Sequence, residues 1–183
     1  MDSHEATRTL EVIRTLMERT TQYQFLTARA GLAAGTLAGA GSLSFLLLEA
    51  SDPWHFGLVW AVVFAGSLLA TIASTVLRVR ERGEKVWSRQ ARAVLVALAP
   101  SVFAALVLSV LFFALGLHLW LPGVWMLCYG QGALATATYA PAPIRHLGLA
   151  ILGLAGPTFL LGPEWASLCM GLVFGCGHIW LGA

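Results

Sequence analysis

Six long apolar stretches fill most of this chain, and they constrain its fold more than any other feature. Each is close to the roughly 20 residues that an α-helix needs to cross a bilayer. The chain is 58% hydrophobic and 11% charged, which leaves more apolar surface than one soluble domain of 183 residues can bury. The stretches lack the two-residue alternation of membrane β-strands. We therefore predict an all-α, polytopic membrane helix bundle of six transmembrane helices in three hairpins, with spans at about 30–48, 54–77, 93–117, 119–140, 147–161 and 165–183.

The predicted fifth span, 147–161, is the shortest of the six and contains Pro157. Proline removes a helical hydrogen bond and bends the helix. A segment that enters the membrane and returns on the same side is therefore the alternative for this span. Pro100 lies inside the third span, where we expect a second kink.

Charged residues are distributed unevenly between the connections. All eleven basic residues lie before the first span, between the second and third, or after the fourth. The connections on the other side contain only three acidic residues, Glu49, Asp52 and Glu164. By the positive-inside rule, this asymmetry predicts that both termini are cytoplasmic.

The segment before the first span, residues 1–29, is predicted to be a cytoplasmic amphipathic helix. Leu10, Ile13 and Met17 recur at helical spacing, with Arg14 and Glu18 on the opposite face. Such a helix either lies on lipid headgroups or binds a cytoplasmic protein, and both interpretations stay open. The basic segment 78–92 is short and contains acidic residues as well, so we do not expect it to bind nucleic acid. We interpret it first as a topology signal, with attraction to anionic lipid as the alternative.

Glycines with helical spacing predict close helix packing. Gly31, Gly35 and Gly39 are four residues apart in the first span, and Gly171 and Gly175 share one face of the sixth. Glycine lets two helix backbones approach each other closely in a membrane. The partner helix belongs either to the same chain or to a second copy, so a homo-oligomer is one of the two alternatives.

His178 lies on the same face of the sixth span as these two glycines, which predicts that it faces protein and not lipid. Trp165 marks the outer boundary, and 13 residues at about 1.5 Å each place His178 roughly 20 Å deep, in the inner leaflet. No acidic residue lies within a span. We therefore expect a neutral imidazole that requires hydrogen-bond partners.

Tyr129 or Gln131 of the fourth span is predicted to supply that hydrogen bond, which makes His178, Gln131 and Tyr129 the candidate ligand-binding residues. Structural bonding between helices, a small ligand pocket and a metal or haem site are the alternatives for this cluster. The metal interpretation is the weakest, because Cys176 and His178 are two residues apart and lie on different helix faces. We expect no cofactor, no metal and no catalytic residue.

Three segments resemble a group of small six-span bacterial inner-membrane proteins to which no activity is assigned. They are IRTLMERTTQY at 13–23, LPGVWMLCYGQG at 121–132 and GCGHI at 175–179. The resemblance spans most of the chain. It implies a multi-pass protein of the bacterial inner (plasma) membrane and a link to a winged-helix regulator encoded nearby. It assigns no role to any residue.

Two functional hypotheses follow from the sequence. The first is a non-enzymatic membrane protein, a sensor or accessory module with a small buried polar site, whose partners are the lipid bilayer and a cytoplasmic protein. The second is a minimal oligomeric transporter or channel for a small solute. The first is preferred because the spans lack the charged residues that ion-coupled transport usually uses.

Overall fold

The fold is helical throughout the part of the chain that the structure describes, a computed structural model covering residues 5, 8–10, 28–48, 52–83 and 87–183. No strand occurs among these residues, so the all-α prediction is confirmed for them. The amphipathic helix predicted for 1–29 lies almost entirely outside the described residues. The elements are α2 (Ala28–Leu48), α3 (Pro53–Glu81), α4 (Arg89–Ala114), the 3-10 turn η1 (His118–Trp120), α5 (Leu121–Thr136), α6 (Ala142–Leu161) and α7 (Pro163–Gly182).

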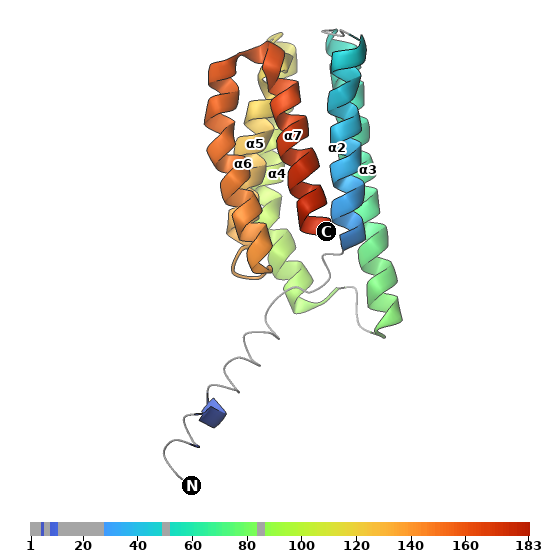
Figure 1. The fold of residues 1–183 in the computed structure, drawn as a ribbon, viewed down its shortest axis with the longest axis vertical. Helices are drawn as coiled ribbons and strands as arrows, with labels where there is room; N and C mark the ends of the chain where they lie inside the picture. Colours follow the sequence, from blue (N-terminus) through green and yellow to red (C-terminus); the bar gives the residue numbers. More distant parts are fainter. Residues whose placement is uncertain (1–4, 6–7, 11–27, 49–51, 84–86) are drawn as a thin grey trace.

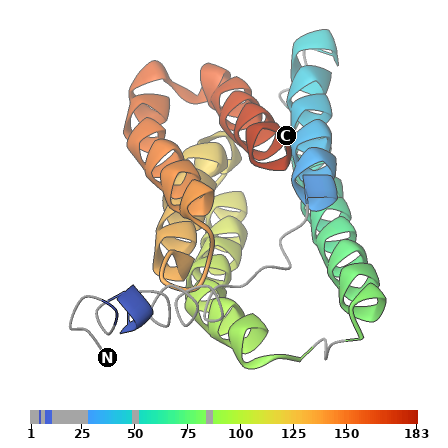
Figure 2. The same ribbon diagram turned by 60° about the horizontal axis from the view of Figure 1, so that its bottom comes forward.

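Helices α2 to α7 run side by side and reverse direction at each connection (Figure 1). Among consecutive helices, α5 and α6 pack most extensively, and the pairs α4/α5, α2/α3 and α6/α7 also pack against each other. The most extensive packing joins α2 to α7, which are far apart in the sequence. Figure 2 shows the end of α7 beside α2 from a second direction. Helices α2 and α7, the first and last of these helices in the sequence, therefore lie side by side in the fold.

Four of the described helices, α3, α4, α6 and α7, are long and apolar enough to cross a membrane. The predicted total of six spans is not supported. Helix α5 has only 16 residues, because η1 precedes it and the chain turns after Thr136. Helix α2 has 21 residues and is on average no less apolar than α3, but it is not among the four.

Helix boundaries differ from the predicted spans where local capping decides them. Helix α3 continues to Glu81, because the charged residues after position 77 remain helical. Helix α4 begins at Arg89, where the side chain of Ser88 accepts a hydrogen bond from the backbone N–H of Ala91 at 3.1 Å.

Helix α6 corrects the prediction of a short or re-entrant fifth span. It begins at Ala142, five residues before the predicted start, and runs for 20 residues. Pro141 precedes it and Pro143 lies in its first turn, where a missing N–H leaves no helical hydrogen bond unmade. Pro157 lies inside the helix, and its side chain is exposed. The early start supplies the length that the prediction lacked.

The core lies between α5, α6 and α7. Met126, Ile151 and Ala155 are fully buried there, and Leu147 and Met170 complete the cluster. By contrast, only 11% of the apolar segment of α3 and 6% of that of α4 is buried. These two helices are therefore peripheral and present most of their large apolar side chains outward.

Basic side chains gather at one end of the bundle. Arg78 and Arg80 lie in the last turn of α3, Arg89 and Arg92 begin α4, and Arg145 lies near the start of α6. Figure 1 shows these helix ends on the same side as the C-terminus. At the opposite end Asp52 caps α3, its carboxylate accepting a hydrogen bond from the backbone N–H of His55 at 2.9 Å. We call the basic end the inner end and the opposite end the outer end, as labels of position within the bundle.

Candidate functional site

His178 lies near the inner end of α7, between two other helices. Its backbone carbonyl faces α2, where a Cβ added to Gly31 would come within 2.8 Å of the oxygen. Its ring contacts α5 through Tyr129. One residue of α7 therefore contacts both α2 and α5.

Both ring nitrogens of His178 are within hydrogen-bond distance of a partner. Nδ1 lies 2.8 Å from the carbonyl oxygen of Phe174, one turn earlier on α7. Nε2 lies 2.9 Å from the hydroxyl oxygen of Tyr129. A carbonyl can only accept, so Nδ1 donates; in the neutral ring Nε2 then accepts and the Tyr129 hydroxyl donates. The two bonds together select one tautomer of the imidazole.

The rings of Tyr129 and His178 also contact each other, and a third ring, that of Phe174, contacts both. Phe174 stacks on His178 with ring centroids 5.7 Å apart and an interplanar angle of 10°. Tyr129 contacts Phe174 at 5.0 Å and His178 at 5.6 Å. The site is thus a filled contact in which a ligand of the imidazole would have to replace the hydroxyl of Tyr129.

Gln131, the other residue predicted to bond His178, lies elsewhere. Its side chain is exposed on α5, whereas that of Tyr129 is half-buried against α7. Residues two apart on an α-helix point in nearly opposite directions, so only one of them can face a given neighbour. The structure thus brings Tyr129 and His178 together but not Gln131, and a ligand-binding role for any of the three stays a prediction.

The glycines of α2 and α7 meet each other within the same chain. A Cβ added to Gly35 would lie 2.6 Å from the carbonyl oxygen of Gly175, and one added to Gly175 would lie 3.4 Å from the Cα of Gly39. A Cβ at Gly171 would overlap the side chain of Ser42. A Cβ at Gly39 itself would meet no atom within 4 Å. The backbones of α2 and α7 are therefore close over most of their length, although not every glycine is required for it.

Ser42 is a packing residue that the sequence analysis missed. Its hydroxyl donates a hydrogen bond of 3.0 Å to the carbonyl oxygen of Ser167 on α7, and both residues are buried. The signal was present, because Ser42 follows Gly39 by three residues and so continues the stripe of small residues on α2. This bond ties the outer halves of α2 and α7.

At the outer end, histidine is part of an aromatic cluster. His118 is buried, stacks on Phe113 with centroids 5.7 Å apart and contacts Phe56 edge-on at 5.5 Å. His55 packs edge-on against Phe45. Within the described ranges, no group of three or more His, Cys, Asp or Glu side chains is placed to hold a metal ion.

Comparison with known proteins identifies no relative: no protein-family model, curated protein or solved structure matches the chain. The resemblance to small bacterial inner-membrane proteins therefore stays a prediction.

Proposed function

We propose that the chain is a non-enzymatic membrane protein, a sensor or accessory module in which the bond between Tyr129 and His178 couples a buried site to the inner end. The observation that supports this most directly is the 2.9 Å contact between the Tyr129 hydroxyl and Nε2 of His178. It is a single polar bond between two otherwise apolar faces of α5 and α7.

The contacts of α7 with α2 and with α5 suggest how this bond takes part in a conformational change. Helix α7 packs on α2 along one side and meets α5 on another. A small molecule that hydrogen-bonds to Nε2 would displace the Tyr129 hydroxyl and weaken only the contact with α5. The arrangement therefore supports two states, with α7 bonded to α5 or released from it, which is what a sensor requires.

Further features support the proposed membrane topology of six spans with both termini cytoplasmic. Helix α5 is about 24 Å long, and η1 adds about 6 Å, which together match the roughly 30 Å hydrocarbon core. Nine of its residues are buried, so neighbouring helices and not lipid surround much of it. The basic residues at the inner end favour a cytoplasmic location for that end. The resemblance noted in the sequence supports the bacterial inner membrane, and the inner end is where we place the cytoplasmic protein partner.

The coupling is tested by hydrogen–deuterium exchange of the protein in lipid nanodiscs. Tyr129→Phe removes the hydroxyl and keeps the ring. We expect faster amide exchange in α5 and α7 and also at the inner ends of α3 and α4, because the released helix loosens its neighbours. Tyr139→Phe is the matched control, since Tyr139 is 39% exposed and lies beyond the end of α5.

The two outcomes separate a coupling role from a purely structural one. Faster exchange that reaches Arg78–Glu81 or Arg89–Arg92 supports the proposal. Faster exchange confined to α5 and α7 contradicts it and makes the bond a local packing interaction.

A minimal oligomeric transporter or channel is the second candidate, and the exposed apolar faces of α3 and α4 leave room for the second copy that it needs. Both helices present large apolar side chains such as Leu69 at 66% and Val110 at 74% exposure, which a second copy could cover. Vesicles containing the purified protein would then show a solute flux that His178→Ala changes. Absence of flux across a panel of small solutes would leave the module as the better proposal.

A further inference from the structure

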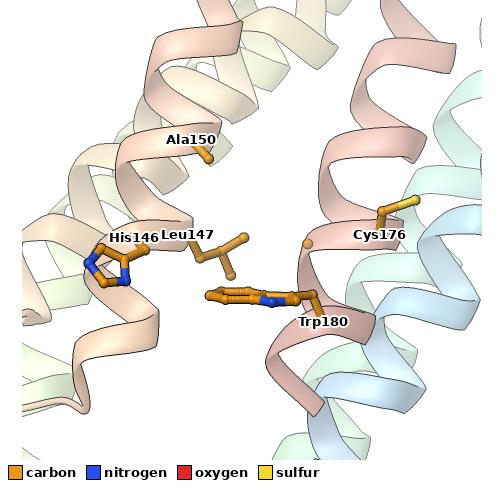
Figure 3. A pocket seen from close by; sticks show the side chains of 6 residues that line it. His146, Leu147, Ala150, Cys176 and Trp180 are labelled. Carbon is orange, nitrogen blue, oxygen red and sulfur yellow. The ribbon is translucent and has the colours of Figure 1, made fainter. Parts of the chain in front are cut away.

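A groove lies between α6 and α7 near the inner end of the bundle. Its volume is about 360 Å³, within the range of roughly 300–1,000 Å³ that is typical of sites for small molecules. Figure 3 shows the ring of Trp180 extending from α7 toward α6, with the side chain of Leu147 pointing toward it and the ring of His146 directed away from it. The lining consists of His146, Leu147, Ala150, Cys176, Gly177 and Trp180.

The groove is largely apolar and opens sideways. The described residues that line it include no Asp, Glu, Lys or Arg. Ala150 and Trp180 are exposed on its two walls, whereas Leu147 is buried at its floor. Both helices are candidates to cross a membrane. In the six-span arrangement proposed above, a molecule dissolved in the apolar part of the bilayer therefore reaches the groove directly.

Leu147 separates this groove from the bond between Tyr129 and His178. On one side it borders the groove, and on the other it belongs to the buried cluster against which Tyr129 and Phe174 pack. Phe174 in turn stacks on His178. Gly177, which also lines the groove, directly precedes His178, so the groove and the bond lie at the same depth along α7. The side chain of Leu147 therefore lies between the groove and the rings around the bond.

The groove also gives Leu147 room to move. A Cβ on Gly177 would come within 2.5 Å of Cδ1 of Leu147, so glycine leaves space for this side chain in its present position. A buried leucine is normally held by neighbours on all sides, because protein interiors are closely packed. On one side of Leu147 lies the groove instead, and the side chain can turn into it by changing rotamer. Leu147 is therefore suited to open a passage between the groove and the bond.

The hydrogen bonds of His178 define what a ligand must offer. Nδ1 donates to the carbonyl oxygen of Phe174, so the neutral ring presents Nε2 as an acceptor. The Tyr129 hydroxyl donates to Nε2 and needs a new acceptor when it is displaced. A ligand hydroxyl meets both requirements, because it can donate to Nε2 and accept from Tyr129. A ketone or an ether can only accept, and it would leave Nε2 unpaired, which is costly for a buried group.

We propose that a membrane-soluble molecule with a hydroxyl group, an alcohol or a phenol, enters through this groove and inserts its hydroxyl between Tyr129 and His178. Its apolar part remains in the groove beside Trp180. The inference rests on the function proposed above, because it names the class of ligand that separates α7 from α5. Charged ligands are disfavoured, since no Asp, Glu, Lys or Arg in the lining offers them an opposite charge.

Photolabelling in lipid nanodiscs tests the proposal. The probe is para-propylphenol with a diazirine in its propyl chain, and the reference is the methyl ether of the same molecule, which has no donor. Each is titrated as a mole fraction of the bilayer, and the labelled residues are located by peptide mass spectrometry. We expect the phenol to label residues 146–150 or 176–180 at a mole fraction about fivefold lower than the ether does, the factor that one hydrogen bond contributes. Equal labelling by the two would overturn the proposal.

Variants separate the hydrogen bond from the groove. His178→Phe keeps an aromatic ring and removes Nε2, so the preference for the phenol over the ether should disappear. His146→Phe is the matched control and should retain the preference, because that ring is directed away from Trp180 (Figure 3). Ala150→Phe fills the groove and should reduce labelling by both probes severalfold, whereas Ala104→Phe, at an exposed position of α4, should not. A preference that His178→Phe preserves, or labelling that Ala150→Phe leaves unchanged, would contradict the proposal.

Hydrogen–deuterium exchange distinguishes failure of this inference from failure of the proposed function. The wild-type chain is measured with para-propylphenol and with its methyl ether. If the phenol is preferred in labelling but speeds exchange in α5 and α7 only, the ligand class holds and the coupling to the inner end fails. If the phenol is not preferred, the ligand class fails, and the coupling is still decided by Tyr129→Phe. The comparison of the two probes uses the wild-type chain, so it does not depend on the folding of any variant.

Discussion

The hydroxyl oxygen of Tyr129 lies 2.9 Å from Nε2 of His178, its acceptor in the described part of the bundle. The imidazole cannot rotate to find another partner without breaking the 2.8 Å bond from Nδ1 to Phe174, over which it is stacked. At the residue scale, the tautomer, the rotamer and the contact between α5 and α7 therefore depend on one another.

Removing the hydroxyl should destabilise the fold measurably. Tyr129→Phe leaves Nε2 without a donor inside the bundle, and we expect a loss of about 1 kcal/mol in the free energy of unfolding. Unfolding in mixed micelles by increasing SDS, followed by circular dichroism, measures it. Tyr139→Phe, on an exposed side chain, should change the free energy by less than about 0.5 kcal/mol.

A double-mutant cycle assigns the effect to the bond. If Tyr129→Phe and His178→Ala act through the same contact, their combined loss should be smaller than the two separate losses added together. Strict additivity would show that the two side chains stabilise the fold independently.

The sequence could place His178 on a protein-facing side of its helix but could not choose its partner. The choice between Tyr129 and Gln131 depends on the rotation of α5 about its own axis. Its polar side chains Tyr129 and Gln131 lie on different faces of an otherwise largely apolar helix, so no single polar face indicates the rotation. The rotation of α5 is determined by its packing against α4, α6 and α7. The residue periodicity within one helix does not reveal which neighbouring helices it will contact.

At the element scale, small residues allow α2 and α7 to pack closely. Enlarging one of these residues should therefore separate the two helices. A Cβ at Gly35 would lie 2.6 Å from the Gly175 oxygen and 2.8 Å from the Ile179 nitrogen, both backbone atoms that cannot rotate away. Gly35→Ala should therefore separate the helices and lower the free energy of unfolding by about 1–3 kcal/mol. SDS-induced unfolding again provides the measurement.

Gly39→Ala is the matched control, one turn further along the same helix. A Cβ there meets nothing within 4 Å, and alanine favours the helix by up to about 1 kcal/mol over glycine. We expect no loss or a small gain in stability. Equal losses at both positions would show that α2 and α7 do not pack in this register.

Element boundaries were less predictable than element type. The early start of α6 was missed because the polar residues Arg145 and His146 interrupt the apolar run in its first turns, and hydropathy alone does not detect a helix there. The paired prolines at 141 and 143 were the available signal. In the same way, the reduction of the fourth span to a 16-residue helix reflects the separate turn η1 at its start and the turn after Thr136 at its end.

At the scale of the whole molecule, the uneven distribution of charge between the two ends of the bundle predicts its orientation in a membrane. The arginines of α3, α4 and α6 lie at one end, which is the end where the chain also terminates. If that end is cytoplasmic, every connection has a defined side. The proposal of six spans then rests on whether the short helix α5 crosses completely.

Accessibility of single cysteines resolves this crossing. In a chain whose Cys128, Cys169 and Cys176 are replaced by alanine, Leu117→Cys lies before η1, Tyr139→Cys lies after α5, and Ala183→Cys marks the C-terminus. We expect a membrane-impermeant maleimide to label Leu117→Cys in intact cells and the other two only after permeabilisation, because the positively charged end stays inside.

Each alternative topology gives a different pattern of labelling. If α5 does not cross, the cysteines at 117 and 139 react from the same side. If the bundle is inverted, only the cysteines at 139 and 183 react in intact cells. The expected pattern requires that α5 and η1 together cross about 30 Å, and it therefore tests whether a 16-residue helix, enclosed by its neighbours, functions as a full span.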